Sequence, residues 1–586
     1  MKLKKLFILP ALAASMLSFT SCTDILDQEP LDSFTDDAVW GDLRLAEVYL
    51  NAQYANLMPE NAKGTLFACY TDEVYHKHGY ATENYTQGYL SPEQSGIGWD
   101  DTTWDPWYDY YRYINKINLF LERIDDVPGD DTYRDTLKGQ GLFLRAWNYH
   151  MLYGLFGRVV IVDQTYDLDH EFGEEGRADL DKVADFIVKD LDEAAKLLHN
   201  AEYGPSDLGR ATEGAALALK SRVLLWKASP LFGTPSREKW QAAADAAKAV
   251  IDLNQYYLRP VNNSEEYAAL FFDTNNPEVI FEKIYDPKWG AGENISYLHQ
   301  APMGPYNGYQ GWGTYNPCHE VAAKFQLKDG SHVDFPEYTE EYPWGDREIR
   351  FNANYLVDGD MWGYGSDNQE LQLFLPGWDA ENGTWTTAGR HSAENYDSEW
   401  WNVSETGYYM RKFLDPSYDM TGTLMHTTPW FFLRLAEIYL NYAECQIELG
   451  NNGEALQYIN LIRNRALLPS ATGADIRAEY EYERQMELLF EGQRFFDIRR
   501  WKILDKIYAE PLHFVKVQNM GTDANGKIKK SYTCSIYDEV YDWDLEDWVM
   551  EVKVKQRRYA GEKHYWLPIP RWELNKCPFL DALPYE

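Results

Sequence analysis

The chain has 586 residues and a formal net charge of −38, from 93 acidic and 55 basic side chains. So acidic a protein repels phosphate groups and anionic headgroups, which argues against nucleic acid and anionic lipid surfaces as partners. The length is enough for one large or several ordinary domains, and the cysteines show no CxxC spacing, so they predict neither a disulfide scaffold nor a zinc site.

Residues 1–21 have the organisation of a bacterial lipoprotein signal peptide. Three lysines among the first five residues precede an apolar stretch at 6–19, which is too short to span a bilayer of about 30 Å. Small residues then lead to Cys22, although Phe19 stands where such signals usually carry Leu, Val or Ile. We therefore expect cleavage before Cys22 and a lipid anchor on this residue. An ordinary cleaved signal is the alternative.

The next part of the chain, 22–285, is predicted to be mostly helical. Apolar residues recur at three- and four-residue spacing from Tyr110 to Ile124, on one helical face. Similar stripes, each bounded by Gly, Pro or Asn, occur at 139–156, 180–198, 211–228 and 237–253. Helices of this length with short connections predict antiparallel neighbours stacked in pairs.

Residues 286–430 have a different composition. The segment holds nine of the 21 tryptophans and twelve tyrosines, interleaved with Gly, Asn, Asp and Pro and almost without helical periodicity. We interpret it as an irregular, loop-rich insertion between two helical parts.

Helical periodicity returns in the C-terminal part, 431–586. The expected helices are 433–447, 455–466 and 475–491. The first two, joined by a Gly-Asn-Asn-Gly turn, resemble a tetratricopeptide unit, and the pairs at 181–254 repeat this scheme loosely. Alternating residues at 513–517 and the Asn525-Gly526 pair predict a β-hairpin in the tail.

A set of charged residues surrounds the third of these helices and could be mistaken for a catalytic site. Its members are Glu483, Glu487, Glu491, Arg494, Arg499 and Arg500. Acids and arginines at this density also form ion-pair networks that tie helices together, and we adopt that interpretation.

Several segments, in this order, resemble the SusD/RagB family of Bacteroidetes outer-membrane lipoproteins. The matching segments are 24–27 after Cys22, 142–147 (LFLRAW), 433–444 (LRLAEIYLNYAE), 459–466, 483–494 and 567–570 (LPIP). The resemblance covers nearly the whole chain after position 21. It departs at the end, where the family often has Gln-Asn-Pro-Gly-Tyr and this chain has Asp581 to Glu586.

The resemblance implies a mostly α fold, with four tetratricopeptide-like helix pairs as scaffold and the irregular insertion laid over them. It also implies a non-catalytic, lipid-anchored protein at the surface of the outer membrane. Such a protein captures nutrients for a SusC-like TonB-dependent transporter, which it covers like a lid. The matching motifs belong to the scaffold, so they do not identify the ligand.

A neutral glycan is the ligand that we predict from the insertion. Sugars lay their C–H face on aromatic rings and hydrogen-bond through their rim hydroxyls. The insertion carries 22 acidic and 8 basic residues, which disfavours uronate-rich or sulfated polymers. The predicted ligand-binding residues are Trp99, Asp100, Trp289, Tyr306, Asn307, Tyr309, Trp312, Trp344, Arg347 and Trp362. In the family, ligand contacts come from these same two regions, a loop before an early helix and the insertion.

Other interpretations of these residues compete with this one. Most aromatic residues of such a chain must be core, and we assign Trp147, Trp226, Trp240 and Trp501 to it. His319-Glu320 starts like a zinc-protease motif but Ala323 stands where the second histidine belongs, and His76 and His78 beside Asp72 and Glu73 are interpreted as a polar loop. We therefore expect no catalytic residue, metal or cofactor, and buried free thiols. Peptide binding or adhesion by the same scaffold is the alternative function.

Overall fold

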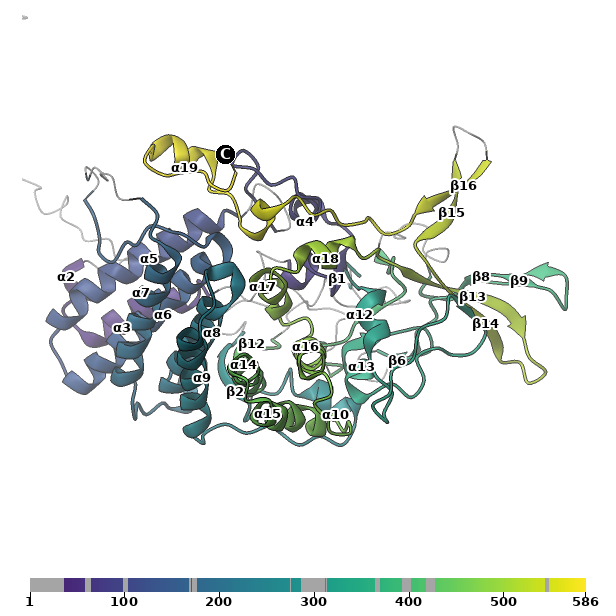
Figure 1. The fold of residues 1–586 in the computed structure, drawn as a ribbon, viewed down its shortest axis with the longest axis horizontal. Coiled ribbons are helices and arrows are strands. Elements are labelled where there is room, and N and C mark those ends of the chain that lie inside the picture. The colour runs from purple at the N-terminus through teal and green to yellow at the C-terminus, as the bar shows by residue number, and fades with distance from the viewer. Residues whose placement is uncertain are drawn as a thin grey trace, which may run out of the picture.

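The computed structural model describes the body of the chain in ten stretches and two single residues. These are 36–57, 65–98, 104–167, 170, 176–274, 276–285, 311, 313–363, 369–392, 402–417, 427–542 and 547–585. Cys22 and the rest of the leader lie outside them. Helices form one end of the molecule and its centre, and short strands and hairpins form the other end (Figure 1).

The N-terminal part is mostly helical. They are α2 (Asp36–Val39), α3 (Leu43–Tyr54), α4 (Tyr80–Thr86), α5 (Pro106–Arg123), α6 (Asp131–Phe156), α7 (Leu180–Leu197), α8 (Glu213–Ala228), α9 (Arg237–Asp252) and α10 (Ser264–Ala269). The predicted helices are confirmed, but α6 begins eight residues earlier than expected. Its first turns are polar, and the Asp130 side chain caps them by accepting a hydrogen bond from the Tyr133 N–H at 2.8 Å.

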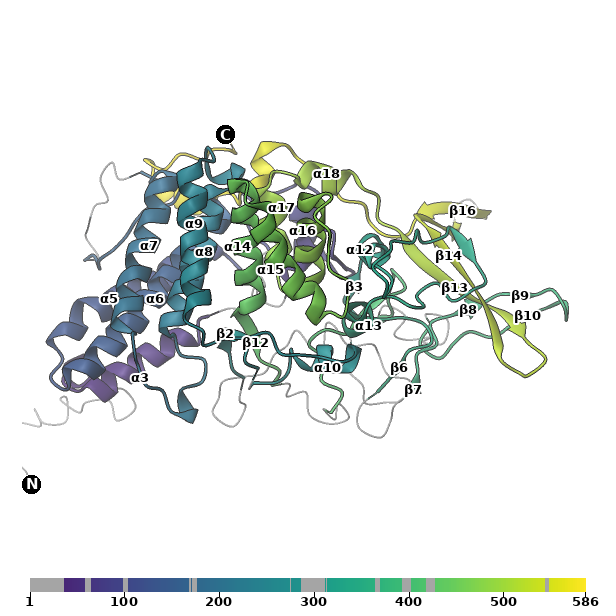
Figure 2. The ribbon, with the colours of Figure 1, turned by 60° about the horizontal axis from the view of Figure 1, so that its bottom comes forward.

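Further helices follow in the C-terminal part. They are α14 (Leu435–Leu449), α15 (Asn452–Arg465), α16 (Ile476–Glu487), α17 (Gln493–Arg500), α18 (Leu504–Ala509) and α19 (Arg571–Lys576). Helix α14 packs against α9 and then α15, so the two helical parts form one scaffold (Figure 2). Among the described residues, no helix has the length and apolar character needed to cross a membrane.

Two boundaries in this part differ from the sequence-based expectation. Leu433 and Arg434 belong to strand β12 (Trp430–Arg434), which pairs antiparallel with β2 (Val279–Lys283) before α14 starts. The helix expected at 475–491 ends at Glu487, because Phe490 adopts a φ of 66° that breaks the helical path. In both cases the apolar pattern of the sequence continues where the backbone changes conformation, so the pattern alone places the helix boundary wrongly.

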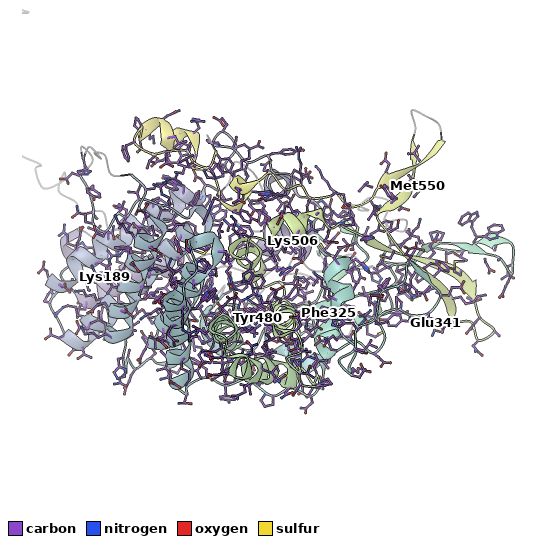
Figure 3. The ribbon with its side chains drawn as sticks, viewed as in Figure 1. Lys189, Phe325, Glu341, Tyr480, Lys506 and Met550 are labelled. Atoms are coloured by element: carbon purple, nitrogen blue, oxygen red, sulfur yellow. The ribbon has the colours of Figure 1, made fainter. Side chains whose placement is uncertain are left out.

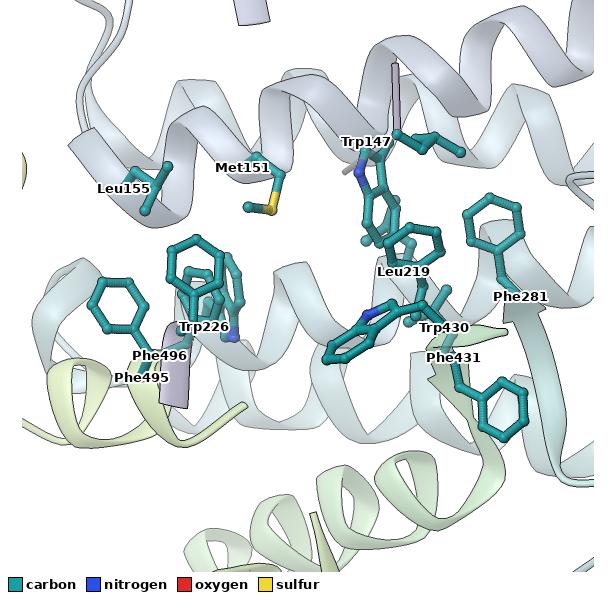
Figure 4. Close-up of a cluster of buried hydrophobic side chains, with 14 of the residues drawn as sticks. Trp147, Met151, Leu155, Leu219, Trp226, Phe281, Trp430, Phe431, Phe495 and Phe496 are labelled. Carbon is teal, nitrogen blue, oxygen red and sulfur yellow. The ribbon is translucent and has the colours of Figure 1, made fainter. Parts of the chain in front are cut away.

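The main core lies where the helices meet the β2–β12 pair (Figure 4). Trp147 packs against Phe432 with ring centroids 4.7 Å apart, and Trp226 stacks on Phe496 at the same distance. The predicted core positions Trp147, Trp226 and Trp240 are buried. Trp501 is half-buried instead and donates its indole N–H to Glu444 at 2.6 Å.

The described part of the insertion is irregular, as predicted, with two helices of only six residues. Its elements are β3 (Tyr315–Pro317), α12 (His319–Lys324), β4 (Tyr338–Thr339), α13 (Ile349–Asn354), β5 (Tyr355–Leu356), β6 (Met361–Trp362), β7 (Gln369–Glu370), β8 (Leu375–Pro376), β9 (Trp378–Asp379), β10 (Thr384–Trp385) and β11 (Tyr409–Met410). Strand β3 pairs antiparallel with β1 (Val74–His76), which ties the insertion to the N-terminal part.

The tail contains the predicted hairpin. Strands β13 (Phe514–Thr522) and β14 (Ile528–Ser535) pair antiparallel around a turn at Gly526, whose φ is 81°. They form a four-stranded sheet in the order β4-β14-β13-β8. A second hairpin, β15 (Tyr537–Asp542) with β16 (Asp547–Val552), projects beside it (Figure 1).

The charged set around α16 is a buried ion-pair network, as predicted. Arg434 contacts Glu487 at 2.8 Å and Glu491 at 2.6 Å, and Arg350 contacts Glu483 at 2.6 Å. Arg494 pairs with Asp72, and Arg500 with Glu444 and Asp497. Arg499 differs from the others, because its guanidinium donates to backbone carbonyls, among them that of Gly154 at 2.8 Å. The network joins α13, β12, α16 and α17.

The buried carboxylate of Glu444 makes the stability of this network depend on pH. Burial opposes its ionisation, but Arg500 at 2.5 Å lowers the pKa of Glu444 to about 2. A depressed folded-state pKa contributes stability above the unfolded value near 4.5, and this contribution is lost as the pH falls toward 2. We expect Glu444→Gln to reduce the loss of stability between pH 5 and pH 3, by up to roughly 2 kcal/mol. Urea unfolding at several pH values measures the free energy of unfolding, with the exposed-site variant Glu193→Gln as control. If the free energy of unfolding falls equally with pH in both variants, the prediction is wrong.

The cysteines of the described chain are free thiols, as expected. Cys69, Cys318 and Cys445 are buried, and Cys534 and Cys577 are half-buried. Burial raises the pKa of each of these five thiols, so they are protonated near neutral pH.

Candidate functional site

Most of the predicted ligand-binding residues lie outside the part of the chain that the structure describes. They are Trp99, Asp100, Trp289, Tyr306, Asn307, Tyr309 and Trp312. The residue before Trp99 is anchored, because the Gly98 N–H donates to the Tyr70 hydroxyl at 2.9 Å. These seven positions stay predictions.

The three predicted residues that are described are all buried. Trp344 is 2% exposed, packs edge-on against Tyr532 at 5.2 Å and donates its indole N–H to the Tyr408 hydroxyl at 3.2 Å. Arg347 is 2% exposed and donates to the backbone carbonyls of Ala323 and Phe325. Trp362 is 8% exposed. Their burial favours the packing interpretation over sugar stacking at these positions.

A cavity of about 800 Å³ lies between α12, α18 and the end of β14. Its volume is in the range of small-molecule sites. The lining residues are Asp72, His319, Glu320, Lys324, Phe335, Glu337, Lys506, Ile507, Glu510, His513, Cys534, Ser535, Ile536 and Arg557. Lys506 marks its position in Figure 3. No local sequence motif predicts this cavity, because its walls come from segments far apart in the sequence.

Hydrogen bonds between distant segments position the cavity walls. The pairing of β1 with β3 places α12 next to Asp72, and the Cys318 N–H donates to the Glu73 carbonyl at 2.9 Å. Helix α18 is held on the same segment, because the Tyr508 hydroxyl donates to the Tyr70 carbonyl at 2.8 Å. The two helices that flank the cavity are therefore fixed by one stretch of chain.

One wall of the cavity is cationic. The carboxylate of Asp72 accepts two hydrogen bonds from Arg494, at 2.8 and 2.9 Å, and lies 3.5 Å from the Lys324 ammonium. Burial opposes its ionisation, but Arg494 and Lys324 hold the pKa of Asp72 well below its usual range. Arg557 is held at the adjacent Thr71 carbonyl at 2.9 Å, and its guanidinium lies 5.3 Å from the Tyr508 ring centroid.

The lining also includes the Glu320 carboxylate and two histidines, His319 and His513. Oε1 of Glu320 accepts the His513 backbone N–H at 2.7 Å and lies 2.8 Å from its Nδ1, and this contact raises the pKa of His513. Oε2 of Glu320 is buried without a hydrogen-bond partner among the described residues. Burial lowers the pKa of His319 to about 4, so its ring is neutral at physiological pH.

This arrangement suits binding by hydrogen bonds. Four acidic and three basic side chains line the cavity, together with His513, so it offers donors and acceptors without a strong excess of either charge. The thiol of Cys534 is a poor nucleophile, because burial raises its pKa to about 12. Among the described residues, no group of three His, Cys, Asp or Glu side chains is placed to hold a metal ion.

Two family profiles together cover nearly all of the chain after the leader. The profile of the SusD family matches residues 277–585, which is more than half of the sequence. The chain belongs to the SusD family. A second profile, described as "Starch-binding associating with outer membrane", matches residues 24–225 of this SusD-family protein.

Relatives and solved structures agree with this assignment. SusD-like protein P38 of Formosa agariphila is 23% identical over 526 residues, covering 85% of this chain and 92% of that protein. The crystal structure of a SusD-like protein from Bacteroides fragilis matches with a TM-score of 0.77 and 26% identity, over 95% of this chain and 100% of the other. A SusD-like carbohydrate-binding protein from the same species matches with a TM-score of 0.70 and 21% identity, over 92% and 99% of the two chains. The mostly helical, tetratricopeptide-like SusD fold expected from the sequence is confirmed.

Proposed function

We propose that this SusD-family protein binds a neutral glycan at the surface of the outer membrane, without cleaving it, and passes it to a SusC-like TonB-dependent transporter. The observation that carries the ligand class is the cavity between α12 and α18. Its lining provides many hydrogen-bonding groups with nearly balanced charge, which suits a ligand rich in hydroxyl groups. The description of the second profile and the name of the carbohydrate-binding relative point in the same direction.

A polyanionic ligand fits the protein less well. The whole chain has a net charge of −38, and 22 acidic against 8 basic residues of this total lie in the insertion. Sulfate or uronate groups along a polymer would be repelled by this field, especially at low ionic strength. Tight binding to a sulfated polysaccharide in isothermal calorimetry, with none to neutral glycans, would overturn the ligand class that we propose.

The aromatic loops predicted from the sequence remain part of the proposal. Trp99 and the segment 289–312 supply the aromatic faces, and the cavity supplies hydrogen bonds. Affinity electrophoresis in gels containing starch, xylan, galactomannan or β-glucan tests this arrangement. We expect Trp99→Ala and Trp312→Ala each to weaken retention in the gel that slows the wild type. Unchanged retention of both variants would contradict the assignment of these loops.

Lys506 allows a sharper test of the cavity. It lines the cavity from α18, is solvent-exposed and has no ion-pair partner among the described residues, so its removal leaves the fold intact. We expect Lys506→Ala to weaken binding of the retained polysaccharide roughly threefold to tenfold, through loss of a charge-assisted hydrogen bond. Lys502→Ala is the control, because Lys502 lies just before α18, pairs with Glu562 and does not line the cavity. Equal affinities of the two variants would exclude the cavity from the binding site.

A further inference from the structure

Two tryptophans are exposed at the end of the molecule away from the helices. Trp378 and Trp385 lie on the β9–β10 hairpin and are 47% and 67% exposed. They are directly opposed cross-strand partners, so both rings lie on one face of the ribbon, with centroids 5.8 Å apart and planes at 73°. The hairpin extends beyond the rest of the insertion (Figures 1 and 2).

The turn between the two rings is rigidly organised by one buried carboxylate. Asp379 is 5% exposed, and its Oδ1 accepts the backbone N–H groups of Glu381 and Asn382 at 3.0 and 3.1 Å. Its Oδ2 accepts the Asn382 side-chain amide at 2.7 Å, and its carbonyl accepts the Gly383 N–H at 2.8 Å. Four hydrogen bonds to a single residue set the turn and therefore the spacing of the rings.

The hairpin is also fixed to the sheet behind it. The Thr386 hydroxyl donates to the Asn519 carbonyl at 2.8 Å, and Lys529 pairs with Glu381 at 2.8 Å. Gly521 lies against Asp379 so closely that a Cβ on it would come within 2.5 Å of the carboxylate. The two rings are thus held in place before any ligand arrives, which lowers the entropic cost of binding.

We propose that Trp378 and Trp385 form a stacking platform for one sugar ring of a long neutral glycan. This inference rests on the proposed glycan-binding function and adds a second contact outside the cavity and the predicted loops. Open indole faces offer the apolar surface on which the C–H face of a pyranose lies, and the hairpin residues around them, Glu381, Asn382 and Thr384, are polar and exposed.

A protein or lipid surface fits this pair less well. Two partly exposed rings offer at most a few hundred Å², below the roughly 800 Å² that each partner contributes to a stable protein interface. Glu381 pairs with Lys529 and Glu370 with Lys530, so the two lysines of β14 near the hairpin are balanced by acids. This part of the surface therefore does not attract anionic lipid.

Strand β14 contacts the hairpin near its start and lines the cavity near its end. Lys529, which holds the hairpin, and Cys534, which lines the cavity, are five residues apart on β14. At about 3.4 Å per residue this separation is about 17 Å. A glycan long enough to contact both places gains affinity from the second contact, because that contact forms within an existing complex. A short oligosaccharide held in the cavity cannot make it.

The test compares chain lengths with variants of the full protein. We take whichever polysaccharide retains the wild type and its own disaccharide to heptasaccharide series, and measure affinities by calorimetry. Trp385→Ala and Trp378→Ala are expected to weaken polysaccharide binding roughly fivefold to tenfold while leaving binding of the shortest bound oligosaccharide unchanged. Trp385→Phe, which keeps an aromatic face, should restore most of the loss. Tyr257→Ala removes a comparably exposed ring, 61% exposed, on the helical part and should have no effect.

Each result decides between the two proposals. If the wild type is retained and both alanine variants bind the polysaccharide with full affinity, the platform proposal is wrong and the proposed glycan-binding function stands. An equal loss for short and long ligands also overturns it, because the ring would then belong to the primary site. Loss of binding to phosphatidylethanolamine vesicles, with no change in polysaccharide affinity, would assign the pair to a lipid surface instead. No retention of the wild type by any polysaccharide overturns both proposals.

Discussion

Replacing Glu487 with alanine is expected to lower the free energy of unfolding by about 3 to 5 kcal/mol. The Glu487 carboxylate is fully buried and contacts three guanidinium groups, those of Arg434 at 2.8 Å, Arg350 at 3.4 Å and Arg465. These arginines hold the pKa of Glu487 well below its usual range, against the opposing effect of burial. Its removal leaves three buried guanidinium groups with one carboxylate fewer to balance their charge, although each keeps another acidic partner, among them Glu491, Glu483 and Glu278.

Urea denaturation followed by tryptophan fluorescence measures this effect. Glu193→Ala serves as the control, because Glu193 pairs with Lys196 on an exposed helix surface and such pairs are worth less than about 1 kcal/mol. A loss below about 1 kcal/mol in Glu487→Ala would mean that water or a rearranged acid replaces the carboxylate. In that case the network would not be what joins β12 to α16.

Replacing Cys22 with alanine is expected to move the protein from the membrane fraction to the soluble fraction. Each buried CH₂ group of an acyl chain contributes about 0.8 kcal/mol to membrane binding, so an anchor of several chains dominates the partition. Among the described residues no helix can take over this role. Fractionation and labelling with a fatty-acid analogue provide the measurement, in a strain that lacks the adjacent transporter. Full membrane association of the variant there would contradict the lipid anchor at Cys22.

The same variant separates tethering from ligand binding. The purified Cys22→Ala protein should bind the polysaccharide with wild-type affinity, because the cavity and the aromatic loops lie far along the chain from position 22. Growth on that polysaccharide should fall, because the proposed lid would leave its transporter once the tether is removed. Normal growth would show that the protein stays at the transporter through protein contacts alone.

The helical scaffold could be predicted from the sequence because each helix carries its own signal. Stripes at 180–198 and 237–253 correspond to α7 and α9 within one residue, since an amphipathic helix must place its apolar side chains on one face. The hairpin at Asn525-Gly526 was equally local, because a positive φ there favours glycine. The break at Phe490 had no such signal, and the predicted helix ran past it.

The residues of the candidate site could be predicted less well from the sequence than the helices. Trp344, Arg347 and Trp362 stand near glycines, a pattern that predicts exposed binding residues, yet their rings and guanidinium are buried. The exposed pair Trp378 and Trp385 was missed, although the Asn382-Gly383 turn between two tryptophans is a hairpin signal. Exposure depends on which distant segment covers a ring, and nothing in the local pattern carries that information.

The sequence by itself predicts the lipoprotein leader, and it determined the helical scaffold, the family and the acidic character of this protein. These properties depend on local periodicity, on motif order or on composition. Only the tertiary structure decided which charges are buried partners, where the cavity lies and which aromatic rings face solvent. Asp72 and Arg494 are 422 positions apart in the chain and share two hydrogen bonds. Contacts of this kind arise from packing between distant segments, because side chains find their partners only after the helices and strands have been brought together.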